Sequence, residues 1–143
     1  MKNVVYFFFF LICNVSSLFA AEEHDFFGKH LIISYSECDR KALGDLQSLI
    51  AVMNEAVQAS GATILQSAQH IFEPNGLTMV FLLSESHASI HTYPEYGACF
   101  VDLFTCGNNC SSEAFDKVLT AYLQPKQVSK RILIRHHDME DLN

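Results

Sequence analysis

Residues 77–104 read LTMVFLLSESHASIHTYPEYGACFVDLF, and this stretch decides the fold. An apolar run fills each end, at 77–83 and again at 98–104, and such short runs rich in β-branched and aromatic residues predict strands. Between them lies a segment crowded with hydroxyl, imidazole and carboxyl groups, residues 84–97, which we expect to be a loop. This segment, extended through the following strand to residue 107, is called the reactive stretch below.

Further strands are predicted on both sides of this region. A Pro-Asn-Gly sequence at 74–76 is typical of a tight turn, so residues 62–73 are expected to form a hairpin with the strand at 77–83. The runs at 29–36 and 128–135 predict two more strands. The chain is therefore expected to form a largely antiparallel sheet.

Two amphipathic segments predict helices. From Asp39 to Ser60, apolar residues recur every three or four positions, with Asp39 as the expected N-cap and Gly61 as the expected left-handed stop. A second amphipathic segment follows Ser111 and Ser112. The expected fold class is α+β: a two-layer sandwich of a largely antiparallel sheet with helices on one face.

Composition limits the classes of function. The chain has 143 residues, of which 50% are hydrophobic, and this suits one compact domain, predicted over residues 26–136 with a polar tail at 137–143. The formal net charge is -7 with only 9 Lys plus Arg, so no nucleic acid is expected as a partner, because binding to a phosphate backbone depends on clustered cations.

The N-terminal residues 1–21 form a signal-like or membrane-anchor segment. Lys2 precedes an apolar run at 4–13, and small residues follow before the acidic pair at 22–23. This order predicts a protein that is exported or membrane-anchored, with membrane contact through residues 4–20. A cytoplasmic location is the alternative.

Three chemical interpretations of the reactive stretch are open. A serine close to a histidine is typical of a hydrolase, but the Gly-x-Ser-x-Gly elbow is absent. The second interpretation is a metal site. The spacings of the potential ligands match neither Cys-x-x-Cys pairs nor His-Glu-x-x-His, so no metal is expected. In the third, the serine reacts with its own backbone. The potential metal ligands are His87, His91, Glu95, Cys106 and Cys110.

The third interpretation is supported by a resemblance to a known family. The segments ESHASIHTYPE at 85–95 and DLFTCG at 102–107 closely resemble the prokaryotic S-adenosylmethionine decarboxylase proenzymes. The resemblance extends over residues 28–135 and includes Gly-Lys-His at 28–30 and Ser-Gly-Ala-Thr at 60–63. It implies a carboxy-lyase that cuts its own chain and makes its own cofactor.

The resemblance implies a role for each reactive group. Ser86 would attack the carbonyl of Glu85, which would cut the proenzyme into a β chain ending at Glu85 and an α chain starting at Ser86. The cofactor would be a covalent pyruvoyl group at position 86, which forms a Schiff base with the substrate and accepts the electrons left by carbon dioxide. His91 matches the processing proton acceptor, a role that suits a group titrating near neutrality. Cys106 matches the catalytic proton donor.

Further positions match the family's substrate-binding and processing residues. Phe72 and Tyr93 match two aromatic positions around adenine, and Glu95 matches the carboxylate that holds ribose hydroxyls. Thr78 stands where a processing serine is usual. The resemblance also implies a homodimer of αβ units with pockets shared at the interface.

Four departures from the family's pattern leave the substrate open. Tyr93 replaces a usual Trp, Thr78 a serine, Met79 a small residue and Ser34 a glutamate. S-adenosylmethionine is the first expectation, with the product serving as the aminopropyl donor for spermidine biosynthesis. One alternative is a pyruvoyl-dependent decarboxylase of ornithine or arginine. Another is an unprocessed, non-catalytic homologue that acts as a partner subunit.

Overall fold

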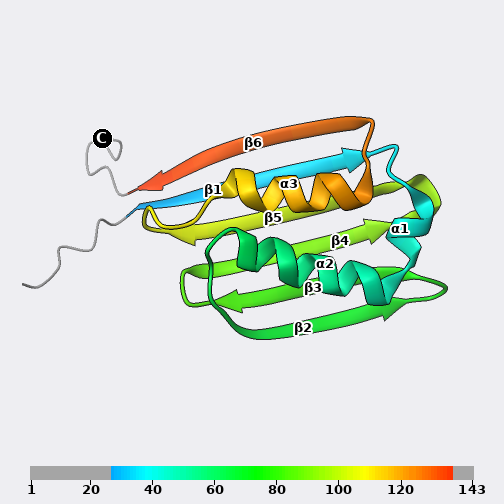
Figure 1. The fold of residues 1–143 in the computed structure, drawn as a ribbon, viewed down its shortest axis with the longest axis horizontal. Helices are drawn as coiled ribbons and strands as arrows, with labels where there is room; N and C mark the ends of the chain where they lie inside the picture. The colour runs from blue at the N-terminus through cyan, green and yellow to red at the C-terminus, as the bar shows by residue number, and fades with distance from the viewer. Residues whose placement is uncertain (1–26, 137–143) are drawn as a thin grey trace, which may run out of the picture.

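The computed structural model of the protein describes residues 27–136, so the predictions for residues 1–21 and the tail at 137–143 lie outside the described residues. In this part of the chain, six strands form one antiparallel sheet in the order β2-β3-β4-β5-β1-β6, and α2 and α3 lie side by side across one face of it (Figure 1). The predicted α+β sandwich is confirmed. In chain order the elements are β1 (Phe27–Ser36), α1 (Arg40–Gly44), α2 (Leu46–Ala59), β2 (Ile64–Phe72), β3 (Gly76–Leu83), β4 (Ser86–Tyr93), the 3-10 helix η1 (Pro94–Tyr96), β5 (Ala98–Cys106), α3 (Ser112–Leu123) and β6 (Gln127–His136).

The two faces of the sheet differ because side chains alternate along each strand. The face under the helices is apolar and buried, and it packs against Leu49 and Met53 of α2 and against Phe115 and Leu119 of α3. Within residues 27–136, no helix covers the opposite face, which is called the open face below. Its apolar side chains are 46–53% exposed and include Val80, Leu82, Phe100 and Leu133.

The prediction of a single helix over residues 39–60 is wrong, because the segment forms two helices, α1 and α2. Asp45 lies at the break with φ -83° and ψ 83°, and its carboxylate accepts a hydrogen bond from the Ser48 N–H at 3.2 Å. An aspartate in this position competes with helical backbone bonds and caps the next helix instead. Asp39 does cap α1, and Gly61 follows α2 with φ 89°, as predicted.

The loop expected at residues 84–97 is also wrong, because most of it forms a strand. β4 pairs with both β3 and β5, and its Ala88, Ile90 and Thr92 side chains are buried in the core. The alternation of apolar and polar residues that marks a strand is weak in β4. Its inward positions include the small Ala88 and the polar Thr92, while histidines occupy outward positions. The reactive side chains are thus held on a central strand.

A polar cluster joins α3 to β1 and β6. The Tyr35 hydroxyl donates to Asp116 Oδ1, and Lys130 Nζ lies 2.6 Å from Asp116 Oδ2. Burial raises the pKa of the Asp116 carboxyl, but hydrogen bonds from Lys130 and Tyr35 and the charge of Lys130 outweigh it, so this pKa lies below its usual value. The cluster fixes α3 over the sheet.

Within residues 27–136, no helix is long and apolar enough to cross a membrane.

Candidate active site

The predicted site residues lie in two groups at opposite ends of β4. One group, called the serine end, contains Glu85, Ser86 and Cys106, at the start of β4 and the end of β5. The other, called the aromatic end, lies where β2 and β4 finish and β3 begins (Figure 1). Seven residue steps along β4 separate the two, which is roughly 23 Å at the usual rise of a strand. The aromatic end consists of Phe72, Thr78, His91, Tyr93 and Glu95.

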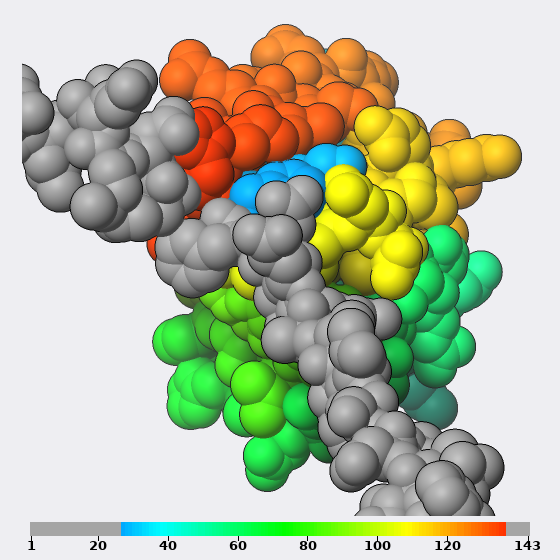
Figure 2. Space-filling view, turned by 90° about the vertical axis from the view of Figure 1, so that its left-hand side faces the viewer, coloured from blue at the N-terminus to red at the C-terminus, as the bar shows by residue number. Residues whose placement is uncertain are grey.

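The serine end is a cavity of about 900 Å³. It is lined by residues of four segments, among them Ser86, Cys106, Phe104 and Arg135. The beginning of β1, the end of β5 and the end of β6 meet at this end of the molecule, which faces the viewer in Figure 2. The antiparallel pairing of β1 with both neighbours therefore builds the cavity around the serine.

The peptide bond between Glu85 and Ser86 is held in a reactive setting. The Glu85 carbonyl oxygen accepts a hydrogen bond from the Cys106 backbone N–H at 2.9 Å, and this bond polarises the carbonyl carbon. Ser86 has a φ of 155°, a backbone conformation that residues with a side chain rarely adopt. The Ser86 hydroxyl lies 3.1 Å from Nδ1 of the adjacent His87. The structure thus places a strained serine, a polarised carbonyl and an imidazole together.

The Glu85 side chain is anchored away from this bond. Its Oε2 accepts a hydrogen bond from the Thr63 N–H at 2.9 Å. Desolvation raises the pKa of Glu85, but hydrogen bonds from Ser84 and from the Thr63 backbone outweigh it, so the pKa lies below its usual value. The anchored carboxylate fixes the residue whose carbonyl would be attacked.

Cys106 differs from the other cysteines of the described chain. Its side chain is exposed and lines the cavity at the serine end, whereas Cys38, Cys99 and Cys110 are buried. Burial and the nearby Glu85 charge raise the pKa of Cys110. Among the cysteines in residues 27–136, Cys106 is therefore the thiol placed to meet a ligand.

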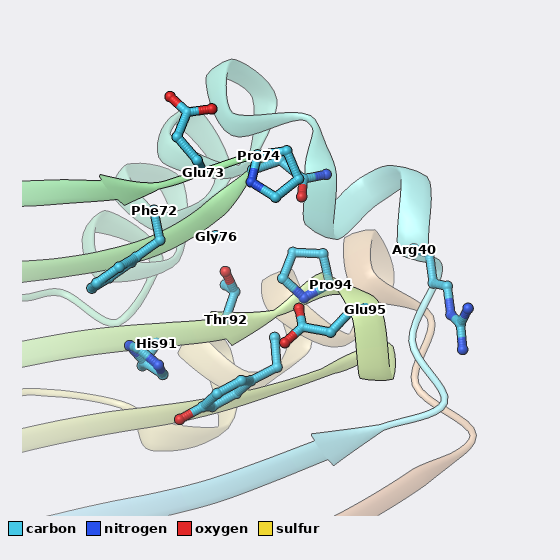
Figure 3. A pocket seen from close by; sticks show the side chains of 11 residues that line it. Arg40, Phe72, Glu73, Pro74, Gly76, His91, Thr92, Pro94 and Glu95 are labelled. Atoms are coloured by element: carbon cyan, nitrogen blue, oxygen red, sulfur yellow. The ribbon is translucent and has the colours of Figure 1, made fainter.

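The aromatic end is a second cavity, of about 640 Å³, lined by Phe72, His91, Tyr93 and Glu95 (Figure 3). The His91 ring lies between two aromatic rings, with ring centroids 5.9 Å from Phe72 and 4.6 Å from Tyr93. Phe72 and His91 point toward one another, and Arg40 points away from both. The predicted aromatic and carboxylate residues therefore share one cavity.

Thr78 belongs to the same group through a direct contact. It pairs with His91 across β3 and β4, and its Oγ1 lies 2.5 Å from His91 Nδ1. A hydrogen bond to Nδ1 fixes the ring orientation and leaves Nε2 as the nitrogen available for chemistry.

The structure does not gather the potential metal ligands. His87 and Cys106 lie at the serine end, while His91 and Glu95 lie at the aromatic end. Over residues 27–136, no group of three or more His, Cys, Asp and Glu side chains is placed to hold a metal ion.

Two residues near the serine were not assigned a role from the sequence. His87 was considered as a metal ligand or a structural residue, although its position next to Ser86 indicated a contact between the two. Arg135 lines the cavity and stacks over the Phe104 ring at 4.3 Å, a contact that depends on the pairing of β6 with β1. No local pattern reveals such a pairing.

Comparison with known proteins identifies the family. A family model described as S-adenosylmethionine decarboxylase matches residues 29–136, and the chain belongs to this family of carboxy-lyases, as predicted. A proenzyme of this name from Thermotoga maritima is 40% identical over 112 residues, covering 78% of this chain and 82% of the relative. Another, from Methanococcus maripaludis, is 39% identical over 101 residues, covering 71% and 83%.

A solved structure agrees with this assignment. The adenosylmethionine decarboxylase from Aquifex aeolicus superposes with a TM-score of 0.73 at 29% sequence identity, covering 83% of this chain and 98% of that chain. The predicted family, enzyme class and fold are therefore confirmed together.

Proposed function

We propose that the protein is a self-processing, pyruvoyl-dependent decarboxylase whose substrate is S-adenosylmethionine and whose product donates aminopropyl groups in spermidine biosynthesis. The observation that carries the proposal is the Glu85–Ser86 bond, where a strained serine faces a cavity and the scissile carbonyl is already hydrogen-bonded. Membership of a family whose relatives are named as proenzymes supports it.

Processing begins with the chain's own residues. The Ser86 hydroxyl attacks the Glu85 carbonyl carbon, and the negative charge that develops on the oxygen is stabilised by the Cys106 N–H, 2.9 Å away. The C–N bond breaks and an ester replaces the amide. Removal of the Ser86 α-proton, for which His91 is the proposed base, then releases the Glu85 carboxylate by elimination. The remaining enamine tautomerises to an imine, and addition of a water molecule then releases ammonia and supplies the oxygen of the keto group at position 86.

The residues around position 86 fit such a group. When present there, a pyruvoyl group supplies a carbonyl that accepts the electron pair left by the departing carboxylate. Cys106 lines the same cavity and is exposed, so its thiol is placed to return a proton to the substrate α-carbon. This defines a chemical step at the serine end.

Substrate recognition belongs to the aromatic end. Phe72 and Tyr93 are 45% and 36% exposed and offer ring faces or edges to a flat base and a sulfonium cation. Glu95 lines the same cavity and can accept hydrogen bonds from ribose hydroxyls. These contacts favour a charged nucleoside over a plain amino acid such as ornithine or arginine.

Both ends are needed for one substrate, and this supports a homodimer. Within one protomer the ends lie roughly 23 Å apart on the open face, too far for a small nucleoside to bridge. A two-fold axis that runs across the strands, between two facing open faces, brings the serine end of one copy to the aromatic end of its partner. The exposed apolar residues Val80, Leu82 and Phe100 would be buried in the same interface.

Covalent trapping tests the substrate. Purified protein is incubated with S-adenosylmethionine, ornithine or arginine and reduced with borohydride, and the mass added to the α chain is measured. We expect an adduct with S-adenosylmethionine alone, and none in the Ser86→Ala variant. Trapping of ornithine or arginine without S-adenosylmethionine would overturn the substrate assignment, and an intact chain that traps nothing would favour a non-catalytic partner subunit.

A further inference from the structure

We propose that His87 is a further catalytic residue of chain processing: it takes the proton from the Ser86 hydroxyl and passes it to the departing backbone nitrogen. This inference rests on the proposed self-processing. Two proton transfers are then carried out by two different histidines. His87 of the same chain takes the proton of the Ser86 hydroxyl, and His91 is the base proposed above for the Ser86 α-proton.

Distance favours His87 for the first step. Its Nδ1 lies 3.1 Å from Ser86 Oγ, within the range for direct proton transfer. His91 lies five residues further along β4, about 17 Å away at the usual rise of a strand. Its Nδ1 is also occupied by the Thr78 hydroxyl. His91 can therefore act on a serine only across a dimer interface, whereas His87 contacts the serine within its own chain.

Packing holds the His87 ring in place on the open face. His87, Phe104 and His30 lie in one row across β4, β5 and β1. The centroid of the His87 ring lies 5.5 Å from that of Phe104 and 6.2 Å from that of His30. The rings of Phe104 on β5 and His30 on β1 thus restrict the rotation of the His87 ring, so its nitrogen stays close to the Ser86 hydroxyl.

The charged groups around this row come from several strands. His30 Nε2 lies 3.5 Å from Asp102 Oδ1, while the Arg135 guanidinium stacks on Phe104. The carboxylate therefore acts on this row through the His30 ring, and the cation acts on it through the Phe104 ring. The imidazole is left to exchange its proton with Ser86.

The proposed step conserves atoms and charge. As Ser86 Oγ bonds to the Glu85 carbonyl carbon, the hydroxyl proton moves to His87 Nδ1. As the bond between that carbon and the Ser86 nitrogen breaks, the same proton moves from Nδ1 to the nitrogen. The products are an ester and a free amine, and His87 is regenerated as neutral imidazole. No oxidant, metal or external base is required.

Replacement of His87 tests the proposal. His87→Asn keeps a polar atom near the Nδ1 position but cannot carry a proton, and His87→Ala leaves space for an external base. The control is Glu55→Gln, an exposed residue of α2 on the helix side of the sheet that lines neither cavity. Freshly translated full-length chains are followed by intact mass, and thermal unfolding checks that each variant folds.

We expect the control to be cleaved at the wild-type rate. Both His87 variants should be cleaved about 100-fold more slowly, within the usual range for loss of a general base. Added imidazole should accelerate His87→Ala and leave His87→Asn unchanged. Cleavage of His87→Asn at the wild-type rate would overturn the inference, as would a slow His87→Ala that imidazole does not rescue. If the wild-type chain itself stays whole, the proposed function fails as well.

Discussion

The Thr78 hydroxyl lies 2.5 Å from Nδ1 of His91, on directly paired residues of β3 and β4. We expect Thr78 to act as a positioning residue, because a hydrogen bond at Nδ1 fixes the ring and leaves the other ring nitrogen, Nε2, for proton transfer. We expect Thr78→Val, which keeps the β-branch but loses the hydroxyl, to slow processing by roughly tenfold or more. Thr78→Ser should process at close to the wild-type rate. Equal processing of all three chains, measured as the fraction cut over time, would show that the contact is incidental.

Cys106 is predicted to act after cleavage. Cys106→Ala should still be cut, because the backbone N–H that contacts the Glu85 carbonyl remains. Its decarboxylation rate should fall by about 10²–10⁴, the usual effect of losing a general acid. Carbon dioxide release from cleaved protein checks this, with Cys110→Ala as the control because that thiol is buried. Unchanged turnover by Cys106→Ala would remove the thiol from the mechanism.

A mixed dimer tests whether each site is built from two chains. Alone, Ser86→Ala and His91→Ala should each remain uncut. When the two variants are expressed together, one of the two sites in a mixed dimer combines an intact Ser86 with an intact His91. In that mixed dimer we expect the His91→Ala chain to be cut and the Ser86→Ala chain to stay whole.

The chains are distinguished by mass. A mixture in which neither chain is cut would contradict the shared site, provided that sedimentation or native mass spectrometry shows mixed dimers. Cleavage of His91→Ala by itself would also contradict it.

Asp116 should make stability depend on pH. Its pKa lies below its usual value in the folded protein, so its contribution is full above about pH 4 and is lost as the pH falls through the lowered pKa. Asp116→Asn should lower the free energy of unfolding by about 1–3 kcal/mol at pH 7, because the buried Tyr35 hydroxyl loses its charged acceptor. Denaturant unfolding should show the two proteins converging in acid. A difference that persists unchanged to pH 2 would exclude this explanation.

Most of the fold could be predicted because its strands and helices have regular patterns. The apolar runs of β1, β3 and β5, the cap at Asp39 and the start of a helix after Ser111 lie close to where they were predicted. β4 was missed because histidines and serines occupy its outward positions, so its alternation resembles a polar loop. The break at Asp45 was missed because an aspartate fits the polar face of a long helix equally well.

The site was harder to predict because it depends on strand order. The residues around Ser86 were identified through a motif, and their roles stay predictions; the contact between Thr78 and His91 depends on the pairing of β3 with β4. Local sequence could not show that the two ends of β4 lie on one open face but far apart. This separation follows from the length of the strand, and it divides the predicted site residues into two groups.

The most direct test of the central claim is the intact mass of the purified wild-type protein. We expect two chains separated between Glu85 and Ser86, with the second lacking a free amino terminus because position 86 has become a keto group. Ser86→Ala, purified in the same way, should remain one chain. A wild-type protein that stays as one uncut chain, or an α chain that begins with an unmodified serine, would contradict it.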